Sequence, residues 1–228
     1  MKRVFQSSNA KTVSPLATVE RNGNDQSNDA KAPLTIALAG NPNAGKTTLF
    51  NVLTGLKQKI ANYPGVTVER KEGVWKLGKV AARLIDLPGL YSLDVTSLDE
   101  QIAGNVLTGK IAGLAKPNVV IAVVDATNLE RNLYLVTQLL EFKIPVVIAL
   151  TMIDAAEKQS LEIDSRRLSK LLQIPVVPII ATQKQGIDEL AQAVLQIAEK
   201  NRIPHLPWLT ENEFSESEDI HLSLSEDA

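Results

Sequence analysis

The stretch of sequence that decides the fold is Gly40-Asn41-Pro42-Asn43-Ala44-Gly45-Lys46-Thr47, followed by Thr48. It fits the pattern G-x-x-x-x-G-K-[ST] and lies between an apolar run that predicts a strand and an amphipathic run that predicts a helix. In that context, glycines let the backbone wrap around phosphates, and the helix N-terminus attracts their negative charge. We therefore predict a phosphate-binding loop, the P-loop, in which Lys46 reaches the β and γ phosphates and Thr47 binds magnesium. An ordinary Gly-rich turn would need neither the Lys-Thr pair nor the preceding strand.

Apolar and amphipathic runs alternate along the rest of the chain. We expect buried strands at 34–39, 81–85, 119–124, 145–150 and 176–180, and helices at 47–53, 98–107, 129–140, 164–172 and 187–198. A further strand at 66–76 should form a hairpin with the next one, because Gly73 and Gly78 mark a turn region. The pattern predicts an α/β fold of the P-loop GTPase (Ras-like) type, with a six-stranded, mostly parallel sheet and helices on both faces.

Composition limits the domain organisation and the class of partner. The 228 residues carry a net charge of -2, so there is no general basic field for nucleic acid. There is no cysteine, which excludes disulfides and thiolate metal sites, and no apolar run approaches the roughly 20 residues that cross a bilayer. We expect a flexible leader at 1–33, a GTPase domain at 34–201 and an acidic, disordered tail at 202–228.

Two motifs after the P-loop have the spacing of phosphate sensors. Asp86-Leu87-Pro88-Gly89 follows a predicted strand, where the acidic residue can hold magnesium through its water shell and the glycine lets the backbone approach a γ-phosphate. Gly65-Val66-Thr67 lies in the segment expected to be the first switch. We predict magnesium ligands at Thr47, Thr67 and Asp86, and expect 57–70 and 87–100 to be the mobile parts. An ordinary strand-ending turn and a strand threonine are the alternative readings.

The end of the chain's strand pattern carries candidates for base recognition. Asp154, in Thr151-Met152-Ile153-Asp154, can accept two hydrogen bonds from the edge of guanine and leave adenine unpaired. Ala181-Thr182-Gln183 follows the last strand and should place backbone amides near the base oxygen. The expected ligands are GTP and GDP. Taken alone, Asp154 would be a helix N-cap more often than a base ligand.

The chain resembles one family over about residues 34–198: the cytosolic G domain of FeoB, the bacterial ferrous-iron transporter. The residues that carry the resemblance are the P-loop with the following Thr-Leu-Phe-Asn51, Asn62-Tyr-Pro-Gly-Val-Thr-Val-Glu-Arg-Lys-Glu-Gly73, Asp86-Leu-Pro-Gly-Leu-Tyr-Ser-Leu93 and Val124-Asp-Ala-Thr-Asn-Leu-Glu-Arg-Asn-Leu133. GTPases in general share the first and third, whereas the second and fourth together resemble this family.

The resemblance implies a regulatory role in ferrous-iron uptake at the inner face of the cell membrane, in the cytoplasm, beside a permease region in the same parent polypeptide or a separate one. It also implies potassium activation, with Asn43 as the potassium ligand and Lys46, Thr67 and Gly89 completing the catalytic set. Leu90 stands where Ras-like enzymes carry a water-orienting glutamine and has no group to position water.

The chain departs from the family pattern in three places. The leader is long, no convincing helical or membrane region follows the G domain, and Thr151 stands where asparagine is expected. We expect the short Thr151 hydroxyl to lose hydrogen bonds with which asparagine ties the loops together and contacts the base, while Asp154 keeps guanine selectivity.

Other functions share these nucleotide motifs. A ribosome-assembly GTPase would normally carry a basic accessory module, which this acidic chain does not offer. A slow nucleotide-switch adaptor would bind GTP and barely hydrolyse it. An ATP-dependent kinase is disfavoured, because Asp154 selects guanine and no catalytic acid for a hydroxyl acceptor stands out.

Overall fold

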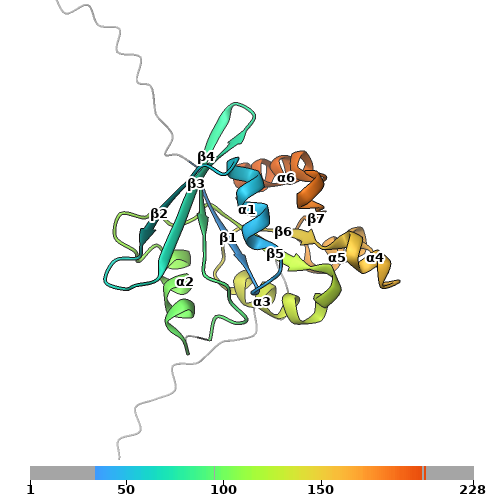
Figure 1. The fold of residues 1–228 in the computed structure, drawn as a ribbon, viewed down its shortest axis with the longest axis horizontal. Helices are drawn as coiled ribbons and strands as arrows, with labels where there is room; N and C mark the ends of the chain where they lie inside the picture. Colours follow the sequence, from blue (N-terminus) through green and yellow to red (C-terminus); the bar gives the residue numbers. More distant parts are fainter. Residues whose placement is uncertain (1–33, 95, 202, 204–228) are drawn as a thin grey trace, which may run out of the picture. The chain divides into compact units, whose positions relative to one another are not determined.

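A central sheet of seven strands organises the structure, a computed structural model that describes residues 34–94, 96–201 and 203 (Figure 1). The strand order is β2-β3-β4-β1-β5-β6-β7. Strands β4, β1, β5, β6 and β7 run parallel, whereas β2 and β3 extend the sheet as an antiparallel hairpin. The strands are β1 (Thr35–Gly40), β2 (Gln58–Asn62), β3 (Glu69–Leu77), β4 (Val80–Asp86), β5 (Val119–Asp125), β6 (Val146–Thr151) and β7 (Val176–Pro178).

Six α-helices and two short 3-10 turns connect the described strands. They are α1 (Lys46–Thr54), α2 (Leu98–Thr108), η1 (Ala126–Asn128), α3 (Leu129–Glu141), α4 (Ile153–Lys158), α5 (Ser165–Leu172), η2 (Ala181–Gln183) and α6 (Ile187–Lys200). None of the described helices is long and apolar enough to cross a membrane.

The sheet is buried on both faces, which explains the continuous apolar runs of its central strands. In β1, Ile36 and Leu38 pack into a cluster with side chains of α1 and α6. Ala37 and Ala39 face the opposite way, into a cluster with α2 and α3. Because side chains alternate along a strand, burial of both faces calls for apolar residues at all of the positions 36–39 of β1.

The helices follow from apolar stripes and end signals. In α6, Leu190, Val194 and Ile197 recur at helical spacing and are buried against the sheet. Helix α2 begins at a capping box, in which Ser97 and Glu100 satisfy each other's backbone N–H groups, and Gly109 ends it in a left-handed conformation with φ 74°.

The predicted fold class is confirmed, and the strand count is corrected from six to seven. The missed strand is β2, whose exposed polar side chains gave no apolar run. Its pairing with β3 also means that half of 57–70 lies in strands and not in a loop. The strand predicted at 66–76 begins only at Glu69, and β7 ends at Pro178, although Ile179 N–H still donates to the carbonyl of Leu150 at 2.7 Å. Helix α4 was missed because it is only six residues long.

The predicted leader at 1–33 and all of the predicted tail at 202–228 except Ile203 lie outside the described residues.

Candidate nucleotide-binding site

The P-loop connects the C-terminal end of β1 to the first turn of α1. Asn43 and Gly45 adopt left-handed backbone conformations, with φ 67° and 83°, and the second of these forms the N-cap of the helix. A glycine suits that conformation because a Cβ would strain it. Gly40 is required for another reason: a Cβ there would lie 2.7 Å from the carbonyl oxygen of Val123 on β5. The loop is therefore shaped by the glycines of the motif.

Lys46 and Asp86 meet at this end of the sheet. Lys46 Nζ lies 2.5 Å from Asp86 Oδ1 and donates a hydrogen bond to the carbonyl of Leu87 at 2.6 Å. The two charged side chains are only 10% and 7% exposed, so water screens their attraction weakly. Strands β1 and β4 are parallel neighbours, which brings their C-terminal ends, and hence the two motifs, to one edge.

The loop after β4 lies directly against the P-loop. Leu90 N–H donates to the carbonyl of Gly40 at 3.1 Å. A Cβ on Gly89 would lie only 3.2 Å from Pro42 Cγ, so a glycine at this position allows the two loops to pack closely. The two loops line a cavity of about 430 Å³, formed by Asn41, Pro42, Asn43, Gly45, Lys46, Thr47, Thr48, Gly89 and Met152. A larger hollow of about 700 Å³ lies beside the end of α1 and β3, away from these motifs.

Thr151, the last residue of β6, connects this strand to the P-loop. Its hydroxyl oxygen is 2.7 Å from the carbonyl of Ala44 and 3.1 Å from that of Val124, and the side chain is buried. A hydroxyl has one proton, so it donates to one of these carbonyls at a time. Threonine thus keeps a hydrogen bond to the P-loop, and the predicted loss of further hydrogen bonds relative to asparagine stays a prediction.

The candidate base-recognition residues stand at the ends of β6 and β7. Met152 is in a left-handed conformation with φ 58° and lies over the P-loop, with its Cε 3.6 Å from a Cβ built on Gly45. Asp154 follows in the first turn of α4 and is half-buried. Ala181, Thr182 and Gln183 form η2, which packs beside α1. This is the same end of the sheet as the P-loop, as the prediction required.

The segment with Gly65, Val66 and Thr67 is a tight turn at the start of β3. Tyr63 N–H donates to the carbonyl of Val68 at 3.0 Å, and Val66 N–H donates to that of Tyr63 at 3.2 Å. Thr67 is exposed. Among the described residues, no hydrogen bond joins this turn to the P-loop. The structure thus assembles the P-loop with the Asp86 loop and leaves Thr67 apart from them.

Tyr63 anchors this turn and was missed by the sequence reasoning. Its ring is 1% exposed within the core cluster of α2 and α3, and the hydroxyl has no hydrogen-bond partner among the described residues. Burial raises the pKa of this phenol, and the nearby Arg70 partly opposes that shift. The Arg70 guanidinium carbon lies 5.9 Å from the ring centroid, within the range of a cation–π contact. A single aromatic residue in a polar stretch gave only a weak signal of this anchor.

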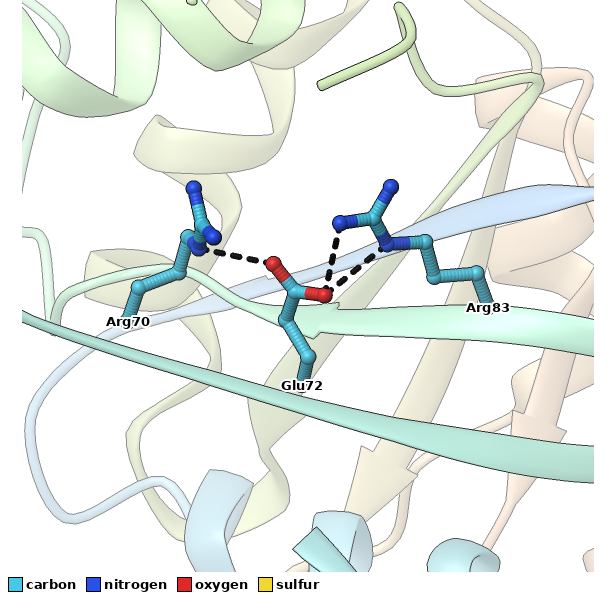
Figure 2. A network of polar contacts seen from close by, with 3 residues as sticks. All are labelled: Arg70, Glu72 and Arg83. Carbon is cyan, nitrogen blue, oxygen red and sulfur yellow. Dashed lines mark hydrogen bonds and ion pairs between the residues drawn. The ribbon is translucent and has the colours of Figure 1, made fainter. Parts of the chain in front are cut away.

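Glu72 on β3 lies between Arg70 of the same strand and Arg83 of the neighbouring strand β4 (Figure 2). Its Oε2 accepts from Arg83 Nε at 2.9 Å and Nη2 at 2.7 Å. Its Oε1 is 2.7 Å from Arg70 Nε but outside hydrogen-bonding orientation, so that contact is ionic only. The network joins β3 to β4 through Arg83 and extends to Tyr63 through Arg70. The cross-strand pairing that makes it could not be seen in the sequence.

The residues present fit a magnesium ion held mainly by phosphates. The described residues contain no group of three or more His, Cys, Asp or Glu side chains that could hold a metal alone. Thr47, which lines the cavity, offers a hydroxyl, and Asp86, which contacts Lys46, offers a carboxylate. Magnesium commonly takes one or two such ligands together with phosphates and waters. Asn43 is exposed and lines the cavity, so its amide oxygen is a candidate ligand for a monovalent cation.

The fold and the site define a P-loop GTPase domain. The family model for ferrous iron transport protein B (FeoB_N) matches residues 34–194. The chain therefore belongs to the FeoB family, and the resemblance seen in the sequence is confirmed.

Curated relatives and solved structures agree with this assignment. The chain is 53% identical over 165 residues to the Fe(2+) transporter FeoB of Salmonella typhimurium. The aligned stretch covers 71% of this chain and 21% of that protein. It thus spans about a fifth of the length of that relative. The cytosolic domain of the T. maritima FeoB iron transporter in its GMPPNP form has a TM-score of 0.71 at 46% identity, covering 76% of this chain and 67% of that one. The L. pneumophila FeoB cytosolic domain has a TM-score of 0.66 at 47% identity, covering 71% and 62%.

Proposed function

We propose that residues 34–201 bind GTP and GDP with magnesium, hydrolyse GTP, and serve as the nucleotide switch of a ferrous-iron transporter. The observation that carries the proposal is the contact between Lys46 and Asp86, because it brings the P-loop cation and the candidate magnesium ligand to one end of the sheet. Related FeoB domains have been solved in GMPPNP and GDP forms, which supports a guanine nucleotide as the ligand.

Nucleotide binding changes the partners of Lys46. In this structure its ammonium group is held by Asp86 and the Leu87 carbonyl. A polyphosphate in the P-loop draws the ammonium toward the β and γ phosphates, which frees the Asp86 carboxylate for the metal. With Thr47 and Thr67, Asp86 would hold magnesium, which supplies positive charge beside the phosphates. Gly89 lets the loop backbone approach the γ-phosphate.

Hydrolysis needs a group other than a glutamine after Gly89. Leu90 is apolar and 2% exposed, so it cannot orient a water molecule. Asn43 is the candidate ligand of potassium, whose charge near the β and γ phosphates would act as an arginine finger does. Phosphate release should be faster in potassium than in sodium buffer, and Asn43→Ala should remove the difference. Equal rates in the two buffers would remove the ion from the mechanism and favour a slow nucleotide switch.

Guanine selectivity is assigned to Asp154, with the backbone of Ala181, Thr182 and Gln183 near the base oxygen. A carboxylate that accepts two hydrogen bonds from guanine leaves adenine unpaired. The proposed partner is the membrane permease region of an FeoB-type transporter, which places the domain in the cytoplasm at the inner face of the membrane. A ribosome-assembly role is less well supported, because the chain is acidic.

The test is calorimetric titration of purified variants with GTP and magnesium. Lys46→Ala should abolish measurable binding, because the main phosphate cation is lost. Asp86→Ala should retain binding and lose magnesium-dependent turnover. Lys59→Ala, at an exposed lysine in β2, is the matched control and should behave as the unmodified chain. Retained GTP affinity in Lys46→Ala, with an unchanged circular dichroism spectrum, would contradict the proposed site.

A further inference from the structure

Asn41, the first residue after β1, carries a buried amide without a partner. The residue is 3% exposed, and its Nδ2 and Oδ1 atoms each expose less than 1 Å² and make no hydrogen bond within the described structure. Asn132 on α3 provides a comparison at 4% exposure: its Oδ1 accepts from Asp125 N–H at 3.2 Å and its Nδ2 donates to Asn128 O at 2.8 Å. Buried amides are normally partnered, because an unpartnered one lowers stability.

The position of Asn41 points to the loop after β4 as the missing partner. Ala37 and Ala39 face the core cluster that contains Leu87 and Leu90, and Asn41 comes next in that two-residue alternation. Leu90 N–H is bonded to the carbonyl of Gly40, the residue directly before Asn41. Asn41 and Gly89 also line the same cavity. Asn41 therefore follows directly on the residue that the Asp86 loop contacts.

A direct contact between this amide and the nucleotide fits the burial less well. Because Nδ2 and Oδ1 are closed off from solvent, an incoming phosphate cannot reach them unless the surrounding backbone moves. Residues 87–96 have no helix or strand where they are described, so a small rearrangement of this loop breaks no regular structure. A side-chain amide offers donors and an acceptor, and can pair with a peptide C=O and N–H together.

We propose that Asn41 is a positioning residue for the phosphate-sensing loop: its amide makes no hydrogen bond in this structure and takes backbone hydrogen bonds from the Gly89–Tyr91 segment when that loop closes on the γ-phosphate. This role rests on the proposed function, because it needs a bound triphosphate. The unpartnered amide destabilises the open state and its pairing stabilises the closed one, so Asn41 biases the loop toward the triphosphate-bound position.

The experiment compares Asn41→Ala with Asn132→Ala in the whole chain. Melting is measured without ligand, and affinities for GDP and for GMPPNP are measured by calorimetry with magnesium. Asn41→Ala should melt at the same temperature as the unmodified chain or up to about 4 °C higher, because no hydrogen bond is lost. Asn132→Ala should melt several degrees lower, on the order of 2–4 °C per hydrogen bond lost. Asn41→Ser serves as the second variant, since it keeps a polar side chain but is too short to bridge.

In both Asn41 variants GDP affinity should stay within about twofold, while GMPPNP affinity should fall on the order of 5- to 100-fold, as expected for the loss of two hydrogen bonds. Hydrogen exchange at 87–94 should slow with GMPPNP in the unmodified chain and not in the variants. The role would be overturned by a lowered ligand-free melting temperature, by equal losses for GDP and GMPPNP, or by unchanged GMPPNP affinity. Failure of the unmodified chain to bind either nucleotide would instead overturn the proposed function.

Discussion

At the scale of the residue, the hydroxyl of Thr151 joins the end of β6 to the P-loop and to the end of β5. It lies at the end of β6, within hydrogen-bonding distance of carbonyls in the P-loop and at the end of β5. Both acceptors are backbone groups of the elements that form the nucleotide site, so one small side chain fixes the P-loop relative to the candidate base-binding segment. Whether threonine also replaces the base contact of an asparagine stays a prediction.

Removing this hydroxyl should destabilise the domain. Thr151→Val keeps the shape of the side chain but leaves Ala44 or Val124 with an unpartnered buried carbonyl, so the free energy of unfolding should fall by about 1–3 kcal/mol. Urea denaturation of the ligand-free chain measures this. Thr151→Ser keeps the donor and should lose less; an equal loss in both variants would show that the methyl group matters and the hydrogen bond does not.

The hydroxyl of Tyr63 should behave in the opposite way. It is buried without a partner, so Tyr63→Phe should leave the free energy of unfolding unchanged or raise it by about 1 kcal/mol. Tyr63→Ala removes the whole ring and should lower it by about 3–5 kcal/mol. Thermal and urea unfolding of the two variants test the pair. A clear loss of stability in Tyr63→Phe would mean that the hydroxyl has a partner.

At the scale of the element, the start of α2 is tied to the loop that precedes it. Glu100 accepts hydrogen bonds from Ser92 Oγ at 2.9 Å, from Thr96 N and Oγ1 at 2.9 and 2.8 Å, and from Ser97 N at 2.8 Å. These bonds, those from the Thr96 side chain first, lower the pKa of Glu100 from 4.5 to about 2. One carboxylate therefore both caps the helix and orders the end of the Asp86 loop.

This carboxylate predicts a pH dependence of stability. Because the folded-state pKa is lowered, the contribution of Glu100 is complete above pH 4.5 and is lost as the pH falls toward about 2. Glu100→Gln should be less stable than the unmodified chain at neutral pH, and the difference in melting temperature should shrink across that window. The measurement is thermal unfolding at a series of pH values with ionic strength fixed. A difference that stays constant down to the lowest pH would contradict the assignment.

Helix α3 holds the same loop from the other side. Gln138 accepts from Leu93 N–H at 2.8 Å and donates to Asp94 Oδ1 at 2.7 Å. Near the start of the same helix, the Arg131 guanidinium carbon lies 4.1 Å from the centroid of the Tyr91 ring. These contacts hold the loop in the position seen in this structure.

Gln138→Ala should therefore speed hydrogen exchange at 91–97 by about 5- to 20-fold, as expected for the loss of two hydrogen bonds in a partly exposed site. Thr137→Ala is the matched control, since Thr137 bonds only to the Tyr134 carbonyl of its own helix. Equal exchange in the two variants would show that α3 does not restrain the loop.

The elements that the sequence predicted are those with a strong apolar period. The five parallel strands and the five longer helices were placed to within a few residues, because burial on both faces of the sheet or along one helix stripe leaves a regular pattern. Strand β2 was missed because it is an exposed edge strand, whose side chains leave no apolar pattern. The P-loop could be predicted from its motif, whereas the contacts of Tyr63, Gln138 and Thr151 depend on tertiary packing that no local pattern encodes.

At the scale of the whole molecule, the parallel sheet explains why distant motifs form one site. Strands β4, β1, β5, β6 and β7 all end at the same edge, and the Asp86 loop, the P-loop, Thr151 and η2 follow four of them. If the loop closes on a triphosphate as we propose, the hydrogen bonds of Glu100 and Gln138 would pass the movement to α2 and α3. We expect this path to carry the nucleotide state to the permease region of the transporter.

The central claim is that the domain binds a guanine nucleotide through Asp154, and a base exchange tests it most directly. Xanthine carries an oxygen where guanine has its 2-amino group, so an asparagine at this position should accept xanthine and lose guanine. Calorimetric titration of the unmodified chain and of Asp154→Asn with GTP, XTP and ATP makes the measurement. We predict that the unmodified chain prefers GTP over XTP and ATP by on the order of 100-fold or more, and that Asp154→Asn prefers XTP. Preferred binding of ATP by the unmodified chain, or an unchanged GTP preference in Asp154→Asn, would contradict the account.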